Sequence, residues 1–348
     1  MIEQPAPRSP TLEDVARVAG VSRSTVSRVI NGVRNVDREL QETVRSAVAE
    51  TGYVPNQAAR SLVTKRTGSV ALVVSEAEHR TFDDPFLGRV FTDPFFGRLV
   101  SGIFGELRPR RVNLMLMLTE TDEARNQLVD YLRQGHVDGV MIISTHADDP
   151  LPRLLTESGL PAVLSRRPSR PMPISYVDAD QQAGAALAAE CLAARGCKRV
   201  ATISGPMDMP ASRERLDGFR EAMARHGHAF IPSAEGNFTQ ESGERAVAEL
   251  LAQYPDIDGL FAANDLMAQG ALLALHDRGI AVPGRVAVVG FDDSSAAKAC
   301  RPPLTTVHQP IEDMAAEMAR LLLAHIEDRQ LRATARIFEP TLVVRGSA

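Results

Sequence analysis

Two arginines and several hydroxyl groups near the N-terminus of this 348-residue chain have the spacing of one face of a short helix. Arg23, Ser24, Ser27 and Arg28 alternate with apolar residues, so that all four would point to solvent. A guanidinium can pair bidentately with guanine, and a serine hydroxyl can reach phosphates or base edges. The pattern therefore favours a helix that enters the major groove of DNA. A small helical domain with a solvated polar face would show the same spacing.

A second set of candidate side chains lies in the larger C-terminal part, mostly just after expected strands. It combines aromatic rings, guanidiniums, carboxylates and an amide: Phe95, Phe96, Arg166, Arg167, Phe238, Asn264, Asp265, Asp292 and Asp293. Ligands of open parallel sheets bind beyond the carboxyl ends of the strands. Groups of these types can bind the hydroxyls of a sugar and stack on its apolar face. Any one of them could instead be a helix cap or a surface charge.

The helix that carries the first set needs neighbours to hold it. Thr11 is a suitable N-cap with Asp14 three residues later, which predicts a capping box and a helix that Gly20 ends. Ser22 would cap the second helix at once, and Asn31 would end it. A third helix is expected before residue 52. Two short helices joined by a tight glycine turn and braced by a third form a helix-turn-helix.

A short apolar helix is expected directly after this domain. Tyr53-Val54-Pro55-Asn56 ends one element, and residues 57–63 have helical spacing with Leu62 beside Arg60 and Lys65. Seven residues are too few for a stable helix in water, because nucleation is costly. We therefore expect this segment to fold only against a partner, with Leu62 as an apolar wedge in a minor groove. A flexible linker is the alternative.

From Ser69 onward, short β-branched runs alternate with helical stretches, which predicts an α/β body of parallel sheets. Strands are expected at Val70–Val74, Leu114–Leu118, Val140–Ile143, Ala162–Leu164, Val200–Ile203, Leu260–Ala263 and Val286–Val289. Helices are expected at residues 182–194, 213–225, 242–253 and 266–278. A short internal repeat, in which Val137-Asp138-Gly139-Val140 recurs as Ile257-Asp258-Gly259-Leu260, indicates two similar lobes with a cleft between them.

Composition and charge narrow the class of protein. The hydrophobic fraction of 44% and the charged fraction of 24% are typical of soluble proteins, and the length favours more than one domain. No segment is apolar enough for a membrane span, and the polar start does not resemble a secretory signal. Three cysteines without a CxxC pair favour a reducing cytoplasm. Residues 1–66 contain ten Lys/Arg and seven Asp/Glu, so only this N-terminal part is expected to bind a polyanion.

No catalytic motif is present: GxSxG, Walker A, HExxH and a GxGxxG after the first strand are all missing. An enzyme of the doubly wound class, such as a sugar kinase or dehydrogenase, would need a phosphate loop. A periplasmic binding protein would carry a signal peptide in place of residues 1–66. We expect no catalytic residue, no metal and no cofactor.

Several runs resemble those of the lac/gal repressor family of bacterial transcriptional regulators. Thr11-Leu12-Glu13-Asp14-Val15-Ala16 and residues 19–32 are similar to its helix-turn-helix signature, and residues 53–62 are similar to its hinge helix. In the body, Asp93-Pro94-Phe95-Phe96, Arg215-Leu216-Asp217-Gly218-Phe219, Asn264-Asp265, Val289-Gly290-Phe291-Asp292-Asp293 and residues 303–310 match its recurring stretches. The resemblance spans residues 11 to about 345.

The resemblance implies an α/β fold with an all-α helix-turn-helix head and a two-lobed body similar to periplasmic sugar-binding proteins. The expected parts are a disordered tail (1–10), the head (11–53), a hinge helix and linker (54–66), and an effector-binding and dimerisation domain (67–348). Lobe 1 would hold about 67–165 and 294–325, and lobe 2 about 166–293 and 326–348.

The resemblance also implies site residues. Those for DNA are Thr11, Ser22, Arg23, Ser24, Thr25, Ser27, Arg28, Asn31, Tyr53, Asn56, Ala59, Arg60 and Leu62. Those for the effector are Phe95, Phe96, Arg166, Arg215, Phe238, Asn264, Asp265, Asp292 and Gln309. Two departures stand out: many members have Asp in place of Arg166, and residues 79–92 are roughly an insertion. A guanidinium in place of a carboxylate makes an anionic or phosphorylated ligand plausible.

The expected function is that of a repressor whose affinity for a palindromic operator is changed by a sugar-like effector. A homodimer is expected, because one helix-turn-helix buries too little surface for high specificity. The chain ends at Val344-Arg345-Gly346-Ser347-Ala348 without a leucine-heptad tail, which favours a dimer over a tetramer. The effector's identity and the sign of its effect stay open.

Overall fold

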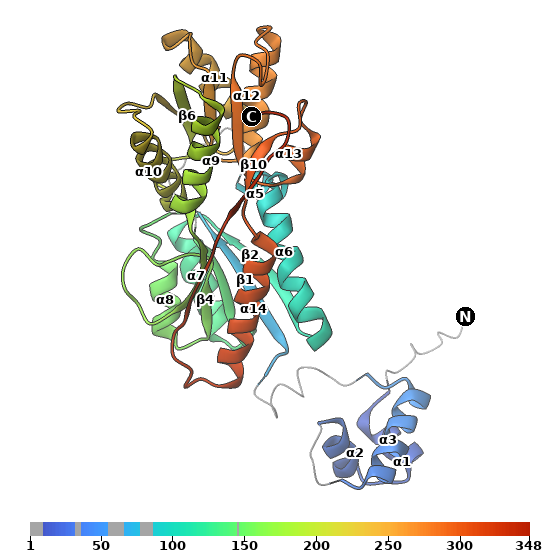
Figure 1. Cartoon of the computed structure of the whole chain (residues 1–348). Coiled ribbons are helices and arrows are strands. Elements are labelled where there is room, and N and C mark those ends of the chain that lie inside the picture. Colours follow the sequence, from blue (N-terminus) through green and yellow to red (C-terminus); the bar gives the residue numbers. More distant parts are fainter. Residues whose placement is uncertain (1–9, 32–35, 55–65, 77–85, 145) are drawn as a thin grey trace, which may run out of the picture. The chain divides into compact units, whose positions relative to one another are not determined.

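The computed structural model describes residues 10–31, 36–54, 66–76, 86–144 and 146–348. These residues form two compact units, the first ending at Gly68 and the second running from Ser69 to Ala348 (Figure 1). The expected N-terminal tail and hinge helix lie outside the described residues, apart from the ends of each segment. Within the described ranges, no helix is both long enough and apolar enough to cross a membrane.

The first unit consists of α1 (Leu12–Ala19), α2 (Arg23–Ile30) and α3 (Arg38–Thr51). Thr11 caps α1 in the expected box: its hydroxyl accepts from the Asp14 amide, and the Asp14 carboxylate accepts from the Thr11 amide. Gly20 then adopts the left-handed conformation (φ 65°), which turns the chain directly into α2. One fully buried valine from each helix fills the shared core: Val15, Val26 and Val44. The predicted three-helix arrangement is confirmed.

The second unit contains two six-stranded sheets. The first has the order β11-β5-β4-β3-β1-β2, with β1 (Ser69–Ser75), β2 (Asn113–Thr119), β3 (Val140–Ser144), β4 (Ala162–Leu164), β5 (Ser175–Ala179) and β11 (Ala335–Phe338). The second has the order β12-β10-β9-β8-β6-β7, with β6 (Val200–Ser204), β7 (Ser233–Glu235), β8 (Gly259–Ala262), β9 (Ala287–Asp292), β10 (Thr305–His308) and β12 (Thr341–Val343). The pairs are parallel except β10 with β12.

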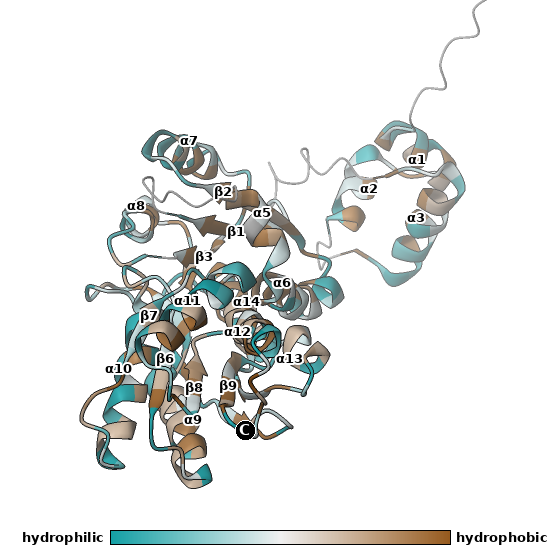
Figure 2. Ribbon diagram, turned by 90° about the horizontal axis from the view of Figure 1, so that it is seen from above, coloured by the Kyte–Doolittle hydropathy of each residue, from teal (hydrophilic) through white to brown (hydrophobic). Residues whose placement is uncertain are grey.

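Helices cover both faces of each sheet. The first sheet lies between the pair α6 (Pro94–Leu107) and α14 (Ile311–Glu327) and the pair α7 (Asp122–Arg133) and α8 (Leu151–Ser158). On the second sheet, one face is covered by α9 (Gln181–Arg195) and α10 (Pro210–Arg225). The other face is covered by α11 (Gln240–Gln253) and α12 (Asp265–Asp277). Shorter helices are α5 (Phe86–Thr92), η1 (Arg108–Arg110) and α13 (Ser295–Ala299). Figure 2 shows apolar strands enclosed by helices whose outer faces are hydrophilic.

Each sheet with its helices forms one half of the second unit. The chain crosses from one half to the other three times: between β5 and α9, between β10 and α14, and between β11 and β12. The two-lobed fold is therefore as expected, but its boundaries need correction. Strands β5 and β11 belong to the first sheet, and β10 belongs to the second, whereas the boundaries implied by the resemblance place each in the other lobe. These strands are only four or five residues long, and their sheet is decided by pairing with residues far away in the sequence.

α6 and α14 pack so closely that only glycine fits at one contact. A Cβ built on Gly102 would lie 2.2 Å from the carbonyl oxygen of Glu312 and 2.9 Å from the Cβ of Ala315. Neither atom is the far end of a flexible side chain, so relief requires a shift of a whole helix. Gly105, one turn along the same helix, has nothing within 4 Å.

We expect Gly102→Ala to lower the free energy of unfolding by about 1–3 kcal/mol, because overpacking forces the two helices apart. Gly105→Ala is the matched control and should raise this free energy by about 0.5–1 kcal/mol, because alanine is the better helix former. Urea titrations followed by circular dichroism measure both. Equal stability of the two variants would contradict the close packing.

Candidate functional site

The α2 helix presents a polar face to solvent. Arg23, Ser24 and Arg28 are exposed, and Val26 on the opposite side is buried in the core. Arg23 Nε lies 3.1 Å from Glu13 Oε1, and both side chains are more than half exposed. An exposed ion pair of this kind contributes at most about 1 kcal/mol. The Arg23 guanidinium can therefore exchange its partner for a phosphate or a base at little cost.

Hydrogen bonds of serine and threonine hydroxyl groups stabilise the two ends of α2. Ser22 Oγ accepts from the Thr25 amide at 3.1 Å and lies 2.7 Å from Ser24 Oγ and 2.9 Å from Thr25 Oγ1. At the other end, Asn31 Nδ2 donates to Ser27 Oγ at 3.3 Å. The structure thus places the candidate DNA contacts between residues 22 and 31 on one short helix and its caps.

Two further candidates stabilise the unit itself. The Thr11 hydroxyl donates to Asp14 Oδ2 at 2.8 Å, and hydrogen bonds from Thr11 and Arg17 lower the pKa of Asp14 to about 2. Tyr53 packs, partly buried, against the three-helix core. A contact of either with DNA stays a prediction. The roles of Asn56, Ala59, Arg60 and Leu62 fall outside the described part of the chain.

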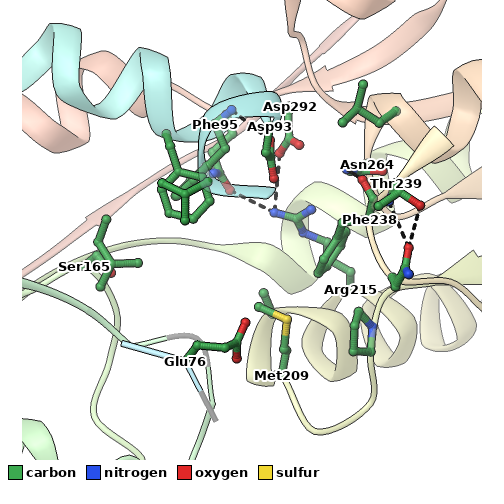
Figure 3. Close-up of a pocket in the computed structure, with 18 of the residues that line it drawn as sticks. Glu76, Asp93, Phe95, Ser165, Met209, Arg215, Phe238, Thr239, Asn264 and Asp292 are labelled. Carbon is green, nitrogen blue, oxygen red and sulfur yellow. Dashed lines mark hydrogen bonds and ion pairs between the residues drawn. The ribbon is translucent and has the colours of Figure 1, made fainter. Parts of the chain in front are cut away.

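A cleft of about 360 Å³ opens between the two sheets of the second unit. It is lined by all the candidate effector residues except Asp265: Phe95, Phe96, Arg166, Arg215, Phe238, Asn264, Asp292 and Gln309. Figure 3 shows Glu76 and Ser165 on one side, Thr239 and Asn264 on the other, and Arg215 between them. Glu76 and Ser165 follow strands β1 and β4, and Asn264 follows β8, so the cleft lies at the carboxyl ends of both sheets, as expected.

Arg215, on α10, is the centre of the polar wall, and its side chain is only 7% exposed. It donates from Nε to Gln181 Oε1 (2.8 Å), from Nη1 to the Ala263 carbonyl (2.5 Å) and from Nη2 to Gln309 Oε1 (3.3 Å). Its guanidinium carbon lies 3.8 Å from the centroid of the Phe291 ring. Gln181 follows the first crossing and Gln309 lies in the second, and the two amides also bond to each other at 2.9 Å. One guanidinium therefore ties together two of the three crossings.

Two carboxylates near Arg215, the buried Asp292 and the half-buried Asp93, are only partly compensated. Asp292 Oδ1 lies 3.5 Å from Arg215 Nη2 and has no hydrogen-bond partner in the part of the chain that the structure describes. Burial raises the pKa of Asp292 and the pKa of Asp93, although the positive charge of Arg215 opposes both shifts. A buried acceptor without a donor is costly. The wall therefore offers a carboxylate oxygen to which a ligand hydroxyl can donate.

Backbone strain concentrates at the same place. Phe238, Asp292 and Asp293 have φ values of 68°, 109° and 53°, a region that costs non-glycine residues about 1–3 kcal/mol. Asn264 Nδ2 donates to the Phe238 carbonyl at 2.9 Å, and Arg345 Nη2 donates to Asp293 Oδ1 at 2.5 Å. These bonds hold the strained loops in the conformation that lines the cleft.

Arg166 does not present a free positive charge to the cleft. Its Nη2 lies 3.2 Å from Glu214 Oε2, and the two side chains are 20% and 38% exposed. Arg166 follows β4 in the first half and Glu214 belongs to α10 in the second, so the ion pair also bridges the halves. Within the protein, the carboxylate of Glu214 therefore balances the guanidinium of Arg166.

Asp265 was a candidate effector residue, but it does not reach the cleft wall. Its carboxylate accepts from Thr306 Oγ1 at 2.5 Å and from the Ser294 amide at 2.6 Å, and it is 1% exposed. The preceding Asn264 caps α12 by accepting from the Met267 amide at 2.9 Å. Asp265 thus joins β10 to the loop after β9, which is a structural role. Its position in the sequence, just after a strand, fits this role and ligand binding equally well.

Several cleft residues were missing from the sequence-based set. Asp178 belongs to β5 and Gln181 follows it, and this strand was not predicted. Asp93 caps α6 and stands in the Asp93-Pro94-Phe95-Phe96 run, which could have revealed it. Phe86 and Val90 of α5 also line the cleft, so the stretch that we expect to be an insertion contributes to its wall.

Arg98 of α6 joins the halves beside the cleft. Its guanidinium forms a bidentate ion pair with Glu312, with Nε 2.7 Å from Oε1 and Nη2 2.6 Å from Oε2. It also donates to the carbonyl oxygens of Asp292 at 2.6 Å and Gln309 at 3.2 Å. The hydrogen bonds from Arg98 hold the pKa of Glu312 below its ordinary value, against the opposing effect of burial.

Comparisons with known proteins agree with this division of the chain. Residues 11–56 match the model of bacterial regulatory proteins of the lacI family, and residues 189–348 match that of a periplasmic binding protein-like domain. The HTH-type transcriptional regulator CelR of Thermobifida fusca is 45% identical over 345 residues, 98% of each chain. A solved CelR–cellobiose complex is 42% identical with a TM-score of 0.75, covering 97% of this chain and 100% of that one. A lac repressor dimer bound to operator and the anti-inducer ONPF is 25% identical with a TM-score of 0.81, covering 98% and 99%.

The Arg98–Glu312 pair predicts a pH dependence of stability. Because the pKa of Glu312 is lowered in the folded protein, the pair stabilises the fold above the ordinary glutamate pKa of 4.5. This stabilisation is lost as the pH falls through the lowered value. Glu312→Gln should therefore flatten the fall in unfolding free energy below pH 5. Urea titrations at a series of pH values measure this, with Glu157→Gln, in an exposed pair with Arg153, as the control. Identical pH profiles for wild type and Glu312→Gln would contradict the prediction.

Proposed function

The chain belongs to the lacI family of bacterial regulatory proteins, and we propose that it is a transcriptional repressor whose operator affinity is changed by a neutral sugar bound in its cleft. One observation carries the proposal. The same chain holds an exposed arginine-bearing helix after a tight turn, and a cleft whose walls come from two halves joined by three crossings. The first can read DNA, and the second can change shape with a ligand.

In this proposal α2 is the recognition helix. The Arg28 guanidinium reads a guanine in each half-site, and Arg23 and Ser24 choose neighbouring bases. Arg23 leaves its exposed pairing with Glu13 when it meets the DNA. Thr11, Ser22, Thr25, Ser27, Asn31 and Tyr53 position the helix and contact phosphates.

The hinge segment completes the DNA interface. Asn56, Ala59, Arg60 and Leu62 would fold against the minor groove, with Leu62 as the wedge. Two chains would bind adjacent half-sites of a palindromic operator as a homodimer, like the lac repressor dimer in the operator complex.

The effector is a neutral polyhydroxy compound. Asp292 and Arg215 offer an acceptor and donors side by side, and Phe95 and Phe238 offer aromatic faces. Glu214 balances Arg166, and Asp93 adds a further carboxylate, so the wall does not favour an anion. The similar regulator whose structure contains cellobiose suggests a glucoside of this kind as the first ligand to test.

Arg28→Ala tests the DNA half of the proposal. We expect operator affinity to fall by about 1–3 kcal/mol and the preference at one base pair per half-site to relax, because one bidentate contact is lost. Arg45→Ala, an exposed arginine on α3, is the matched control. The operator is found by sequencing genomic fragments that the protein retains, and affinity is measured by fluorescence anisotropy at fixed salt. Equal losses on operator and random DNA would contradict a base contact by Arg28.

Arg215→Ala tests the effector half. We expect cellobiose to change the operator affinity of the wild type and not that of the variant, since the polar wall has lost its donor. Arg225→Ala on the same helix, where Arg225 forms an exposed pair with Glu221, is the control. Asp292→Asn keeps the side-chain size and should weaken the response as well. The chain contains no tryptophan, so calorimetry is preferable to intrinsic fluorescence. Wild-type cellobiose affinity in both variants would contradict the pocket assignment.

A further inference from the structure

A small recess lies beside the main cleft in the first half of the second unit. Its volume is about 60 Å³, and Ser144, Ser165 and Arg166 line both it and the cleft. The recess extends from these shared residues to His146 and Asp149, which do not line the main cleft. The recess therefore adjoins the cleft, and the proposed contacts to the effector leave it unused.

Among the described residues, three polar atoms around this recess are buried without a hydrogen-bond partner. They are His146 Nε2, Asp149 Oδ2 and Arg166 Nε. Asp149 is the most constrained of the three, because its side chain is only 1% exposed. Its Oδ1 accepts from the Leu151 amide at 2.9 Å and lies 3.8 Å from Arg125 Nε, which leaves Oδ2 for another donor.

Buried polar atoms without partners are rare and costly, at about 1–3 kcal/mol each. Three around one cavity indicate a polar occupant. Arg166 Nε can only donate, Asp149 Oδ2 accepts when ionised, and the imidazole nitrogen can do either. A hydroxyl group both donates and accepts, so it matches the set. The carboxylate of Asp149 would repel an anion, and the guanidinium of Arg166 would repel a cation.

We propose that this recess is a second subsite, which takes the terminal hydroxyls of a neutral saccharide whose first ring lies in the main cleft. The inference rests on the proposed function, since it concerns the same effector. The volume exceeds the roughly 10–15 Å³ that a single water molecule needs, so it can hold a hydroxymethyl group. In this proposal one ring contacts Arg215 in the main cleft and the next contacts His146 in the recess, so the recess selects a disaccharide over a monosaccharide.

The test uses the full-length protein, with cellobiose and glucose as probes in titration calorimetry. His146→Ala should weaken cellobiose binding about three- to tenfold, the effect of one neutral hydrogen bond. His146→Gln retains a donor and an acceptor and should restore most of the affinity. His136→Ala, an exposed histidine in the same half, is the control. Glucose affinity should be the same in all four proteins, and thermal unfolding checks that each variant is folded.

The outcomes separate the two proposals. Equal cellobiose affinity in wild type and His146→Ala would mean that the recess holds ordered water only, and would overturn this inference while leaving the proposed function intact. A parallel loss of glucose and cellobiose affinity in His146→Ala would also overturn it, because the effect would then be general. Absence of cellobiose binding by the wild type would overturn this inference, while the proposed function would still be tested by operator binding of the wild type and of Arg28→Ala.

Discussion

The second unit depends on the burial of one guanidinium. A charge removed from water must be paired and fully hydrogen-bonded, or it destabilises the fold by several kcal/mol. Groups from separate parts of the chain stabilise the charge of Arg215: the Gln181 amide, the Ala263 carbonyl and the Gln309 amide accept its hydrogen bonds, and the Asp292 carboxylate forms an ion pair with it. Satisfying one side chain thus fixes the ends of two strands and two of the crossings between the halves.

The same network explains how a ligand could move the halves. Arg166–Glu214 and the contacts of Arg98 with the Asp292 and Gln309 carbonyls span the cleft, while Arg215 holds the crossings. A ligand that donates to Asp292 Oδ1 would remove an unsatisfied buried acceptor only in the arrangement where both walls reach it. Such a ligand binds the two arrangements with different affinity, and this difference is the only source of allosteric free energy.

Local patterns in the sequence predicted much of this structure. The capping box at Thr11 and the turn at Gly20 located α1 and α2, and β-branched runs located the long central strands of both sheets. The short strands β5, β10 and β11 were not placed in the correct half, because their pairing involves residues far apart in the sequence. For the same reason Gln181 was missed, and Asp265 was expected in a cleft that it only supports. The charge of Arg166 could not be interpreted without its partner Glu214, which is 48 residues away.

The central claim is a coupling between the cleft and the DNA-binding helix, and thermodynamic reciprocity tests it most directly. Titration calorimetry would measure cellobiose binding to the free protein and to its operator complex at the same salt concentration. We predict that the two affinities differ by the same factor, within about 5- to 150-fold, by which saturating cellobiose changes operator affinity. Tight cellobiose binding with equal affinity for the free and the operator-bound protein would contradict the account.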